Sequence, residues 1–258
     1  MDLRRALLTM TALSLSPVSV LAEAPPPQDP TRFPSARRTI LDRFQAGSQE
    51  KIKIAFFDAD STLRVAPSGK VSANSPTDVA ILPMVARAIA RLEEQGYLIA
   101  IVSNQGGVAQ GFITIETADA ALITTMSRLS RLGVTFHYYD FAEKEDQDRK
   151  PDIGMGRRLA LLIEKKLGKR VDWEGTIMVG DSAWKKGVDV EPDGSPGEDF
   201  SNSDRLFAQN LSKAFGGVTF HHPRDYFHWV RYGIRNFPTF KSLLAFVAQH
   251  PQLDPGVN

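Results

Sequence analysis

Five short apolar runs, separated by longer segments with helical periodicity, most limit what this chain can fold into. The runs are rich in β-branched and aromatic residues, and they predict buried strands at residues 52–57, 98–102, 134–139, 176–179 and 218–220. Between the runs, apolar residues recur three or four positions apart, as in residues 79–92, 159–167 and 240–247. This alternation predicts a doubly wound α/β fold, a parallel sheet with helices on both faces.

Three segments are expected along the chain. Residues 1–22 predict a signal peptide, because Arg4 and Arg5 precede an uncharged apolar run that ends before Ala22. That run is shorter than the roughly 20 residues of a membrane-spanning helix. A retained anchor and an organelle transit peptide are less favoured, and Sec and twin-arginine export both stay open. Residues 23–50 predict a proline-rich linker or strap, and residues 51–258 predict one folded domain.

An exported protein, periplasmic or secreted if the source is bacterial, is therefore expected, with no membrane contact after cleavage. The chain has no cysteine, so a disulfide, a thiol nucleophile and a cysteine-based zinc site are excluded. Its 31 Lys and Arg residues nearly balance its 30 Asp and Glu residues. That balance removes the basic field of a non-specific nucleic-acid binder, so a nucleic-acid substrate would need a local basic patch.

Polar residues follow the predicted strands directly, at the edge where a parallel sheet binds its ligands. The first strand runs into DADST at 58–62, the second into SNQGG at 103–107, and the fourth into GDS at 180–182. Lys150 precedes a proline at the start of a predicted helix. Four segments thus bring carboxylates, a hydroxyl and an ammonium to one rim, a set that suits phosphoryl transfer.

Each residue type fits a step of that chemistry. Asp58 and Asp181 offer hard oxygen ligands to Mg²⁺. Once the charge repulsion is screened, Asp58 can attack phosphorus to form an aspartyl-phosphate. Asp60 can then protonate the leaving oxygen and later activate water. Ser103 and Lys150 can bind the phosphate oxygens as a hydrogen-bond donor and a point charge.

These motifs, in this order, resemble the haloacid dehalogenase superfamily of aspartate-nucleophile phosphatases over about residues 51–222. The resemblance implies a haloacid dehalogenase-like Rossmannoid fold. A cap domain is not expected, because residues 60–76 and 140–150 are too short to contain one. The implied site consists of catalytic Asp58 and Asp60, phosphate-binding Thr62, Ser103, Asn104 and Lys150, and Mg²⁺ on Asp58, the backbone carbonyl of Asp60, and Asp181.

A narrower resemblance lies in KPDIGM at 150–155 and DFSNSDRLFAQN at 199–210. Both are similar to the 3′-phosphatase domain of polynucleotide kinase/phosphatase, which implies hydrolysis of 3′-phosphate ends of DNA or oligonucleotides. Asp189, Asp199 and Asp204 are each candidates for an additional acid near the metal, although the helix dipole favours an acid such as Asp204 at a predicted helix start whatever its function. Among the three, the resemblance favours Asp199. Ser61 departs from the usual glycine of the first motif.

A kinase domain is not expected in this chain, because no GxxxxGK[ST] loop occurs. The insert at residues 183–198 borders Asp181, and its Lys185 and Lys186 are candidate substrate contacts, although a solvated loop would explain them as well. His221, His222 and His228 are expected to pack among aromatic residues without a catalytic role.

Other functions stay open. The main alternative is an exported phosphatase of nucleotides or other small phosphoesters. Sugar bisphosphatases share the SNQGG segment, but many have a cysteine-rich zinc loop that this sequence lacks. A non-catalytic module that binds phosphate ends is disfavoured, because both Asp58 and Asp60 are present.

Overall fold

The structure is a computed structural model, and it describes residues 41, 44–185, 187–191, 193–197, 199, 201–228 and 239–253. The predicted signal peptide, most of the predicted linker or strap, and Lys186 lie outside the described residues. Among the helices of the described part, none combines the length and the apolar character needed to cross a membrane.

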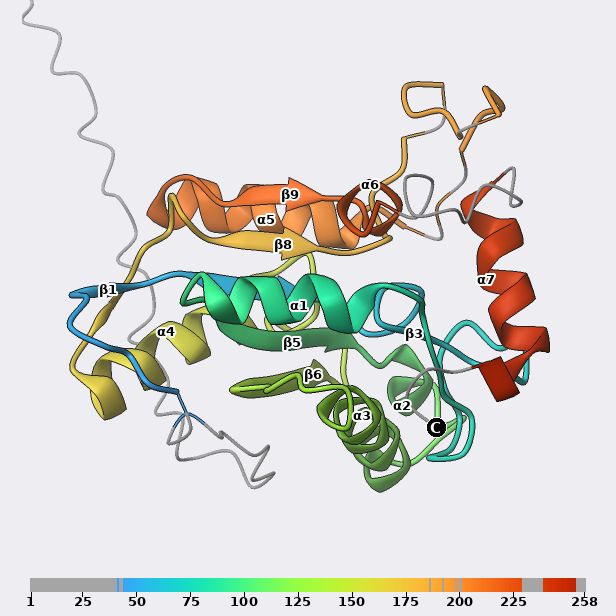
Figure 1. Cartoon of the computed structure of the whole chain (residues 1–258), viewed down its shortest axis with the longest axis horizontal. Coiled ribbons are helices and arrows are strands. Elements are labelled where there is room, and N and C mark those ends of the chain that lie inside the picture. Colours follow the sequence, from blue (N-terminus) through green and yellow to red (C-terminus); the bar gives the residue numbers. More distant parts are fainter. Residues whose placement is uncertain are drawn as a thin grey trace, which may run out of the picture.

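Five parallel strands form the central sheet, in the order β6-β5-β2-β8-β9 (Figure 1). The strands are β2 (Ile54–Phe57), β5 (Leu98–Asn104), β6 (Tyr138–Ala142), β8 (Ile177–Val179) and β9 (Thr219–His221). The chain builds outward from β2 to β6 and then returns to the other side of β2 through β8. The strand order therefore reverses beside β2, and folds of this kind bind ligands at the carboxyl ends of the strands next to such a reversal, here β2 and β8.

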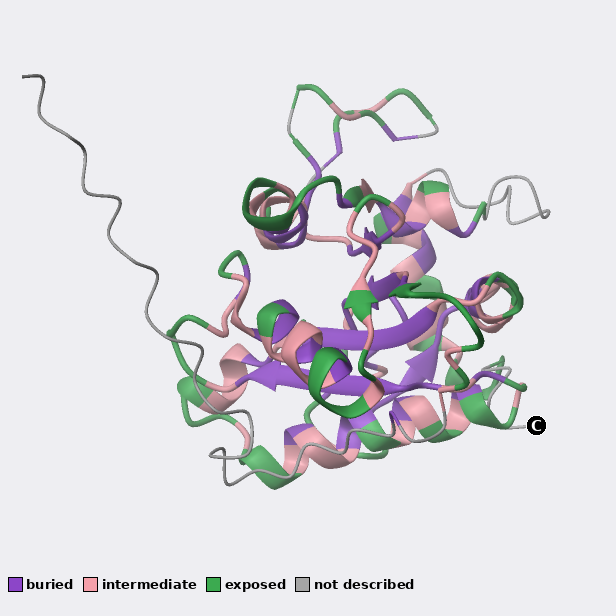
Figure 2. Ribbon diagram, turned by 90° about the vertical axis from the view of Figure 1, so that its left-hand side faces the viewer, coloured by how far each residue is buried: buried purple, intermediate pink, exposed green. Residues whose placement is uncertain are grey.

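Helices cover both faces of the sheet, and each face has its own core. The first core contains α1 (Val85–Glu94), α3 (Ile115–Ser130) and α7 (Phe240–Gln249), and the second contains α4 (Gly154–Leu167) and α5 (Ser203–Phe215). Figure 2 shows the strands between them as the most buried part of the molecule. The predicted doubly wound fold is confirmed.

Residues of β2 alternate between the two cores. Ala55 and Phe57 belong to the core with α1, whereas Ile54 and Phe56 belong to the core with α4. All four side chains are fully buried. Burial of a phenylalanine side chain contributes about 1.5–3 kcal/mol, so the strand that ends at Asp58 is firmly anchored from both sides.

The remaining elements are short. β1 (Lys51–Ile52) pairs in parallel with β7 (Arg170–Val171), and β3 (Arg64–Val65) pairs antiparallel with β4 (Ala80–Ile81). Two single-turn helices, α2 (Gly106–Ala109) and α6 (Pro223–Tyr226), and a 3-10 turn at Pro251–Leu253 complete the described elements.

Three predicted boundaries were wrong. The run 52–57 is divided into β1 and β2, and residues 79–84 precede α1, because β4 pairs there with β3. The run 134–139 enters the sheet only at Tyr138. His137 explains this late start, since its ring Nδ1 accepts a hydrogen bond of 3.1 Å from the Ile99 N–H, while its own N–H donates to the Ile99 carbonyl.

Leu41 lies in the segment predicted to be a linker or strap, yet its side chain is fully buried in the core with α4. We expect Leu41→Ala to lower the free energy of unfolding by about 2–5 kcal/mol, because it leaves a cavity in that core. Leu253, which is 60% exposed, is the matched control, and Leu253→Ala should change stability by less than about 0.5 kcal/mol. Urea unfolding of both variants measures the difference, and equal midpoints would place Leu41 outside the cooperative unit.

Candidate active site

Lys150 places a buried ammonium at the carboxyl ends of β2 and β5. Its Nζ lies 2.6 Å from Asp58 Oδ1 and 2.7 Å from Asp204 Oδ1, and it also donates to the Val102 carbonyl at 2.7 Å. The residue is only 2% exposed. Burial alone lowers the pKa of Lys150, but the Asp204 and Asp58 carboxylates outweigh burial and raise that pKa. The ammonium therefore stays charged.

Asn104 fixes the backbone that carries this lysine. Its Nδ2 donates to the Lys150 carbonyl at 2.8 Å, and its Oδ1 accepts from the Lys150 N–H at 2.9 Å. Both ends of the Asn104 amide are thereby engaged by the Lys150 backbone. Its predicted contact with a phosphate stays a prediction.

Three carboxylates gather around the ammonium. Asp58, Asp181 and Asp204 each offer an oxygen, and these atoms lie within 4.8 Å of one another. Burial raises the pKa of Asp58 to about 7, which Lys150 opposes and Asp204 reinforces. Burial, followed by the charge of Asp58, likewise raises the pKa of Asp181 well above its ordinary value. One ammonium does not balance three buried carboxylates.

This donor set fits a divalent cation. Oxygen ligands are the ones that Mg²⁺ prefers, and a cation would offset both the burial and the mutual repulsion that raise the pKa values of Asp58 and Asp181. Asp58, Asp181 and Asp204 would hold it. The predicted contribution of the Asp60 backbone carbonyl stays a prediction.

Asp60 is held by donors from three segments. Arg64 Nε lies 2.9 Å from Oδ1, Gln105 Nε2 donates to Oδ2 at 3.0 Å, and the Ala73 N–H donates to Oδ1 at 3.2 Å. Arg64 is fully buried and also donates to Thr125 Oγ1 in α3. The carboxylate that the sequence predicts as the acid and base is thus fixed in orientation by a buried arginine.

Arg64 and Gln105 were not predicted. The signal that could have found Arg64 is its spacing of four residues from Asp60. Gln105 lies within the SNQGG segment between the predicted phosphate ligand and two glycines. It also donates to Ser103 Oγ at 2.9 Å, so it links the predicted phosphate-binding hydroxyl to Asp60.

Thr62 joins the first motif to the GDS motif. Its buried hydroxyl accepts a hydrogen bond of 3.2 Å from the Asp181 N–H. The preceding Ser61 has a φ of 56°, in the left-handed region that favours glycine. Glycine would adopt this conformation without strain, and holding serine there costs on the order of 1 kcal/mol.

Asp204, rather than Asp199, belongs to the carboxylate cluster. It lies in the first turn of α5, is 1% exposed, and accepts a hydrogen bond of 3.0 Å from the Ser182 N–H. A Cβ on Gly180 would lie 2.3 Å from Asp204 Oδ2, so this packing requires glycine before Asp181. Asp199 is half-buried, and burial raises its pKa to about 7. Its role as an additional acid stays a prediction.

The predicted substrate contacts on the insert receive only a partial description. Lys185 is exposed, and its backbone N–H donates to Asp189 Oδ2 at 2.7 Å. Lys186 lies outside the described residues. Trp184 packs at the base of the insert and donates through its ring nitrogen to the Asp189 carbonyl.

The raised pKa values predict how the stability of the metal-free protein depends on pH. Between about pH 4 and about pH 7 the folded state retains a proton that an unfolded Asp58 has released, so the free energy of unfolding falls as pH rises and levels off above the folded pKa. Burial lowers the pKa of His137 to about 4 and that of His222 to about 3. These two histidines therefore make the free energy of unfolding rise with pH below about pH 6.5. The comparison is therefore made at about pH 6.5 and about pH 8.

In chelator, we expect the melting temperature to be lower at pH 8 than at pH 6.5, by a few degrees, which corresponds to about 1 kcal/mol. Saturating Mg²⁺ should raise the melting temperature more at pH 8 than at pH 6.5, because fewer protons compete there. Asp58→Asn should reduce the pH dependence in chelator. Differential scanning fluorimetry measures all three, and a chelated protein with equal melting temperatures at both pH values would contradict the prediction.

Comparison with known proteins assigns the chain to a family. The family model described as "Polynucleotide kinase 3 phosphatase" matches residues 53–227, which is more than half of the chain. An uncharacterized 20.8 kDa protein of Autographa californica nuclear polyhedrosis virus is 33% identical over 167 residues, covering 64% of this chain and 83% of the viral protein. A probable D-glycero-D-manno-heptose-1,7-bisphosphate 7-phosphatase of Thermoplasma volcanium is 25% identical over 134 residues, covering 50% and 86%.

Among solved structures, a D,D-heptose 1.7-bisphosphate phosphatase from B. bronchiseptica, complexed with magnesium and phosphate, aligns with a TM-score of 0.47 and 18% identity. The alignment covers 70% of this chain and 99% of that chain. The family match and the convergence of all four motifs at the carboxyl edge of the sheet lead to one assignment. The chain belongs to the polynucleotide kinase 3 phosphatase family and is a phosphatase of the haloacid dehalogenase superfamily.

Proposed function

We propose that this phosphatase is a Mg²⁺-dependent phosphomonoesterase that acts through an aspartyl-phosphate and removes 3′-phosphate from the ends of DNA or oligonucleotides. One observation carries the proposal: Asp58 and Asp60 from the first motif, Lys150 and Asp181 come from three separate segments and converge at one rim. The family model over residues 53–227 supports the choice of substrate end.

In the first step, an Asp58 oxygen forms a bond to phosphorus while the bond between phosphorus and the 3′ oxygen breaks. Asp60 gives its proton to that leaving oxygen, and Arg64 and Gln105 hold Asp60 in the orientation for this transfer. The Lys150 ammonium, 2.6 Å from Asp58, offsets the negative charge of the approaching phosphate. Bound Mg²⁺ would further reduce the repulsion between the nucleophile and the phosphate.

In the second step, water attacks the phosphorus of the aspartyl-phosphate. Asp60 takes a proton from that water, and the bond between phosphorus and the Asp58 oxygen breaks. Inorganic phosphate leaves, Asp58 is restored as a carboxylate, and Asp60 is again protonated. The electron pairs and protons therefore balance over the two steps without an external acid.

The open rim also supports a polymeric substrate. Only the β3–β4 hairpin and its loops separate β2 from α1, and only residues 143–153 separate β6 from α4. Neither insertion, in the part of the chain that the structure describes, is large enough to form a cap domain over Asp58. The proposal therefore has a nucleic-acid end at Asp58 and the rest of the strand outside the site.

A second candidate substrate is a small phosphoester such as a nucleotide or a sugar phosphate, and the heptose bisphosphatase relative of Thermoplasma volcanium favours it. Phosphate release from 3′-phosphorylated oligonucleotides, 3′-mononucleotides and heptose bisphosphate distinguishes the two. The proposal expects the highest kcat/KM with an oligonucleotide. A higher kcat/KM with a small phosphoester would replace the oligonucleotide proposal with the small-phosphoester one.

We further propose that residues 1–22 direct export and are then removed. Mass spectrometry of the protein purified from the periplasm or medium of a bacterial host should give a mature chain that begins at Glu23. A full-length chain confined to the cytoplasm would contradict this proposal. The result does not bear on the chemistry of the site.

We expect Asp58→Asn to lower kcat by roughly a thousandfold or more, because an amide does not attack phosphorus. The variant should fold and should not form the beryllium fluoride adduct that mimics an aspartyl-phosphate in the wild type. Asp193→Asn, an exposed change on the insert, is the control and should keep full activity. Near-normal hydrolysis by Asp58→Asn in Mg²⁺ would rule out the covalent mechanism.

Arg64→Met should lower kcat by roughly 10- to 100-fold with little change in KM, because Asp60 loses its fixed orientation while substrate contacts remain. A double-mutant cycle with Asp60→Asn separates this effect from a general loss of structure. In the Asp60→Asn background, Arg64→Met should reduce the residual rate by less than about twofold. The same large loss in both backgrounds would mean that Arg64 does not act through Asp60.

A further inference from the structure

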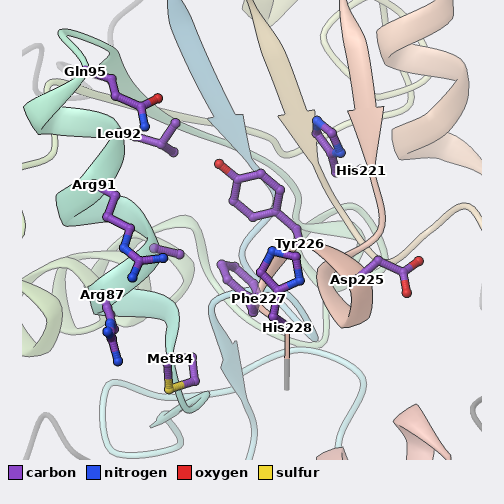
Figure 3. Close-up of a pocket in the computed structure, with 11 residues that line it drawn as sticks. Met84, Arg87, Arg91, Leu92, Gln95, His221, Asp225, Tyr226, Phe227 and His228 are labelled. Atoms are coloured by element: carbon purple, nitrogen blue, oxygen red, sulfur yellow. The ribbon is translucent and has the colours of Figure 1, made fainter. Parts of the chain in front are cut away.

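A basic cavity of about 340 Å³ lies between α1 and the segment that follows β9 (Figure 3). Arg87, Arg91 and Gln95 line it from α1, and His221, Tyr226 and His228 line it from the other side. A cavity of this size accommodates one small polar group of a ligand with its immediate neighbours. The mechanism above uses none of these side chains.

The charge in this cavity is positive. Arg87 and Arg91 lie on successive turns of α1, and Figure 3 shows both side chains on the side of the helix that faces His228 and Tyr226. The acid that lines the cavity, Asp225, is 2.9 Å from Arg224 Nε and points away from Arg91 in Figure 3. No ion-pair or hydrogen-bond partner of the Arg91 side chain occurs among the described residues. Its guanidinium is therefore available to an anion from outside.

The cavity adjoins the catalytic site through two direct contacts. The His221 carbonyl accepts a hydrogen bond of 3.2 Å from the Gly180 N–H, one residue before Asp181. The Tyr226 ring packs against Phe57, the residue before Asp58, with 6.5 Å between ring centroids. The cavity therefore borders the residues that directly precede Asp58 and Asp181.

The remaining lining suits a phosphodiester with its sugar and base. Burial lowers the pKa of His221, so at neutral pH its ring is a neutral hydrogen-bonding group. Tyr226 presents an aromatic ring beside the arginines, and nucleic-acid strands are commonly bound by such a combination of cations and aromatic rings. The chain as a whole has almost no net charge, so a nucleic-acid substrate would need a local basic patch, and the arginines of this cavity offer one.

We propose that this cavity binds the phosphodiester backbone of the substrate strand next to the terminal 3′-phosphate, with Arg91 as the principal contact. The inference rests on the proposed function and names where the strand is held. It assigns strand binding to the α1 side of the rim, in addition to the insert at residues 183–198.

The test compares Arg91→Ala with Lys165→Ala. Lys165 is an exposed cation on α4, on the opposite face of the sheet, so both variants lose one positive charge. Steady-state kinetics use a 3′-phosphorylated single-stranded DNA of about 12 nucleotides and p-nitrophenyl phosphate. Arg91→Ala should raise KM for the DNA roughly 5- to 10-fold and leave p-nitrophenyl phosphate hydrolysis unchanged. The slope of log affinity for the DNA against log salt concentration should become shallower by about 0.7. Lys165→Ala should match the wild type on both substrates.

Equal behaviour of Arg91→Ala and Lys165→Ala on the DNA would overturn the inference, as would equal losses by Arg91→Ala on both substrates. A wild type that releases no phosphate from the DNA would instead refute the proposed function. In that case, fluorescence anisotropy with a labelled 3′-hydroxyl strand still tests the cavity. Weaker binding by Arg91→Ala would support strand recognition there, and unchanged binding would overturn it.

Discussion

The buried ammonium of Lys150 is the interaction on which the rest of the site depends. It lies between the carboxylate of Asp58, which directly follows β2, and that of Asp204 in the first turn of α5, while Lys150 itself lies in the loop before α4. Removal of one partner from such a buried pair typically costs about 3–5 kcal/mol, because the remaining charge is left uncompensated. The same ammonium keeps the nucleophile and the acidic cluster at one point. Lys150 therefore contributes both to the chemistry of the site and to its local stability.

Sequence reasoning succeeded where a residue's position follows from its distance to a strand end. Asp58 and Asp181 were expected to lie close together because the carboxyl ends of parallel strands meet at one edge, whatever the exact register, and the structure brings them together. The central strands were predicted for a similar reason, since both faces of β2 are buried and its four residues are all apolar. The hydrophobic pattern and the position relative to a strand end were sufficient to predict these strands and residues.

Sequence reasoning failed where a side chain replaces a backbone group or finds a distant partner. The ring of His137 bonds to the Ile99 N–H and delays the start of β6, which no periodicity reveals. Arg64 looks solvated until α3 is packed over it, and Asp204 looks like an ordinary helix-start acid until α5 brings it beside Lys150. Each case depends on a contact between segments far apart in the chain, which local patterns do not encode.

The alternation of β2 residues between two cores affects how enzyme activity is lost on heating or in denaturant. Because Phe56 packs under α4 and α5 while Phe57 packs under α1, neither helical layer can detach without exposing the strand that carries the nucleophile. The loop that follows β2 at Asp58 therefore cannot become disordered through that strand while the sheet stays folded. Loss of turnover and loss of the folded sheet should therefore occur as one event, so that residual activity directly reports the fraction of folded molecules.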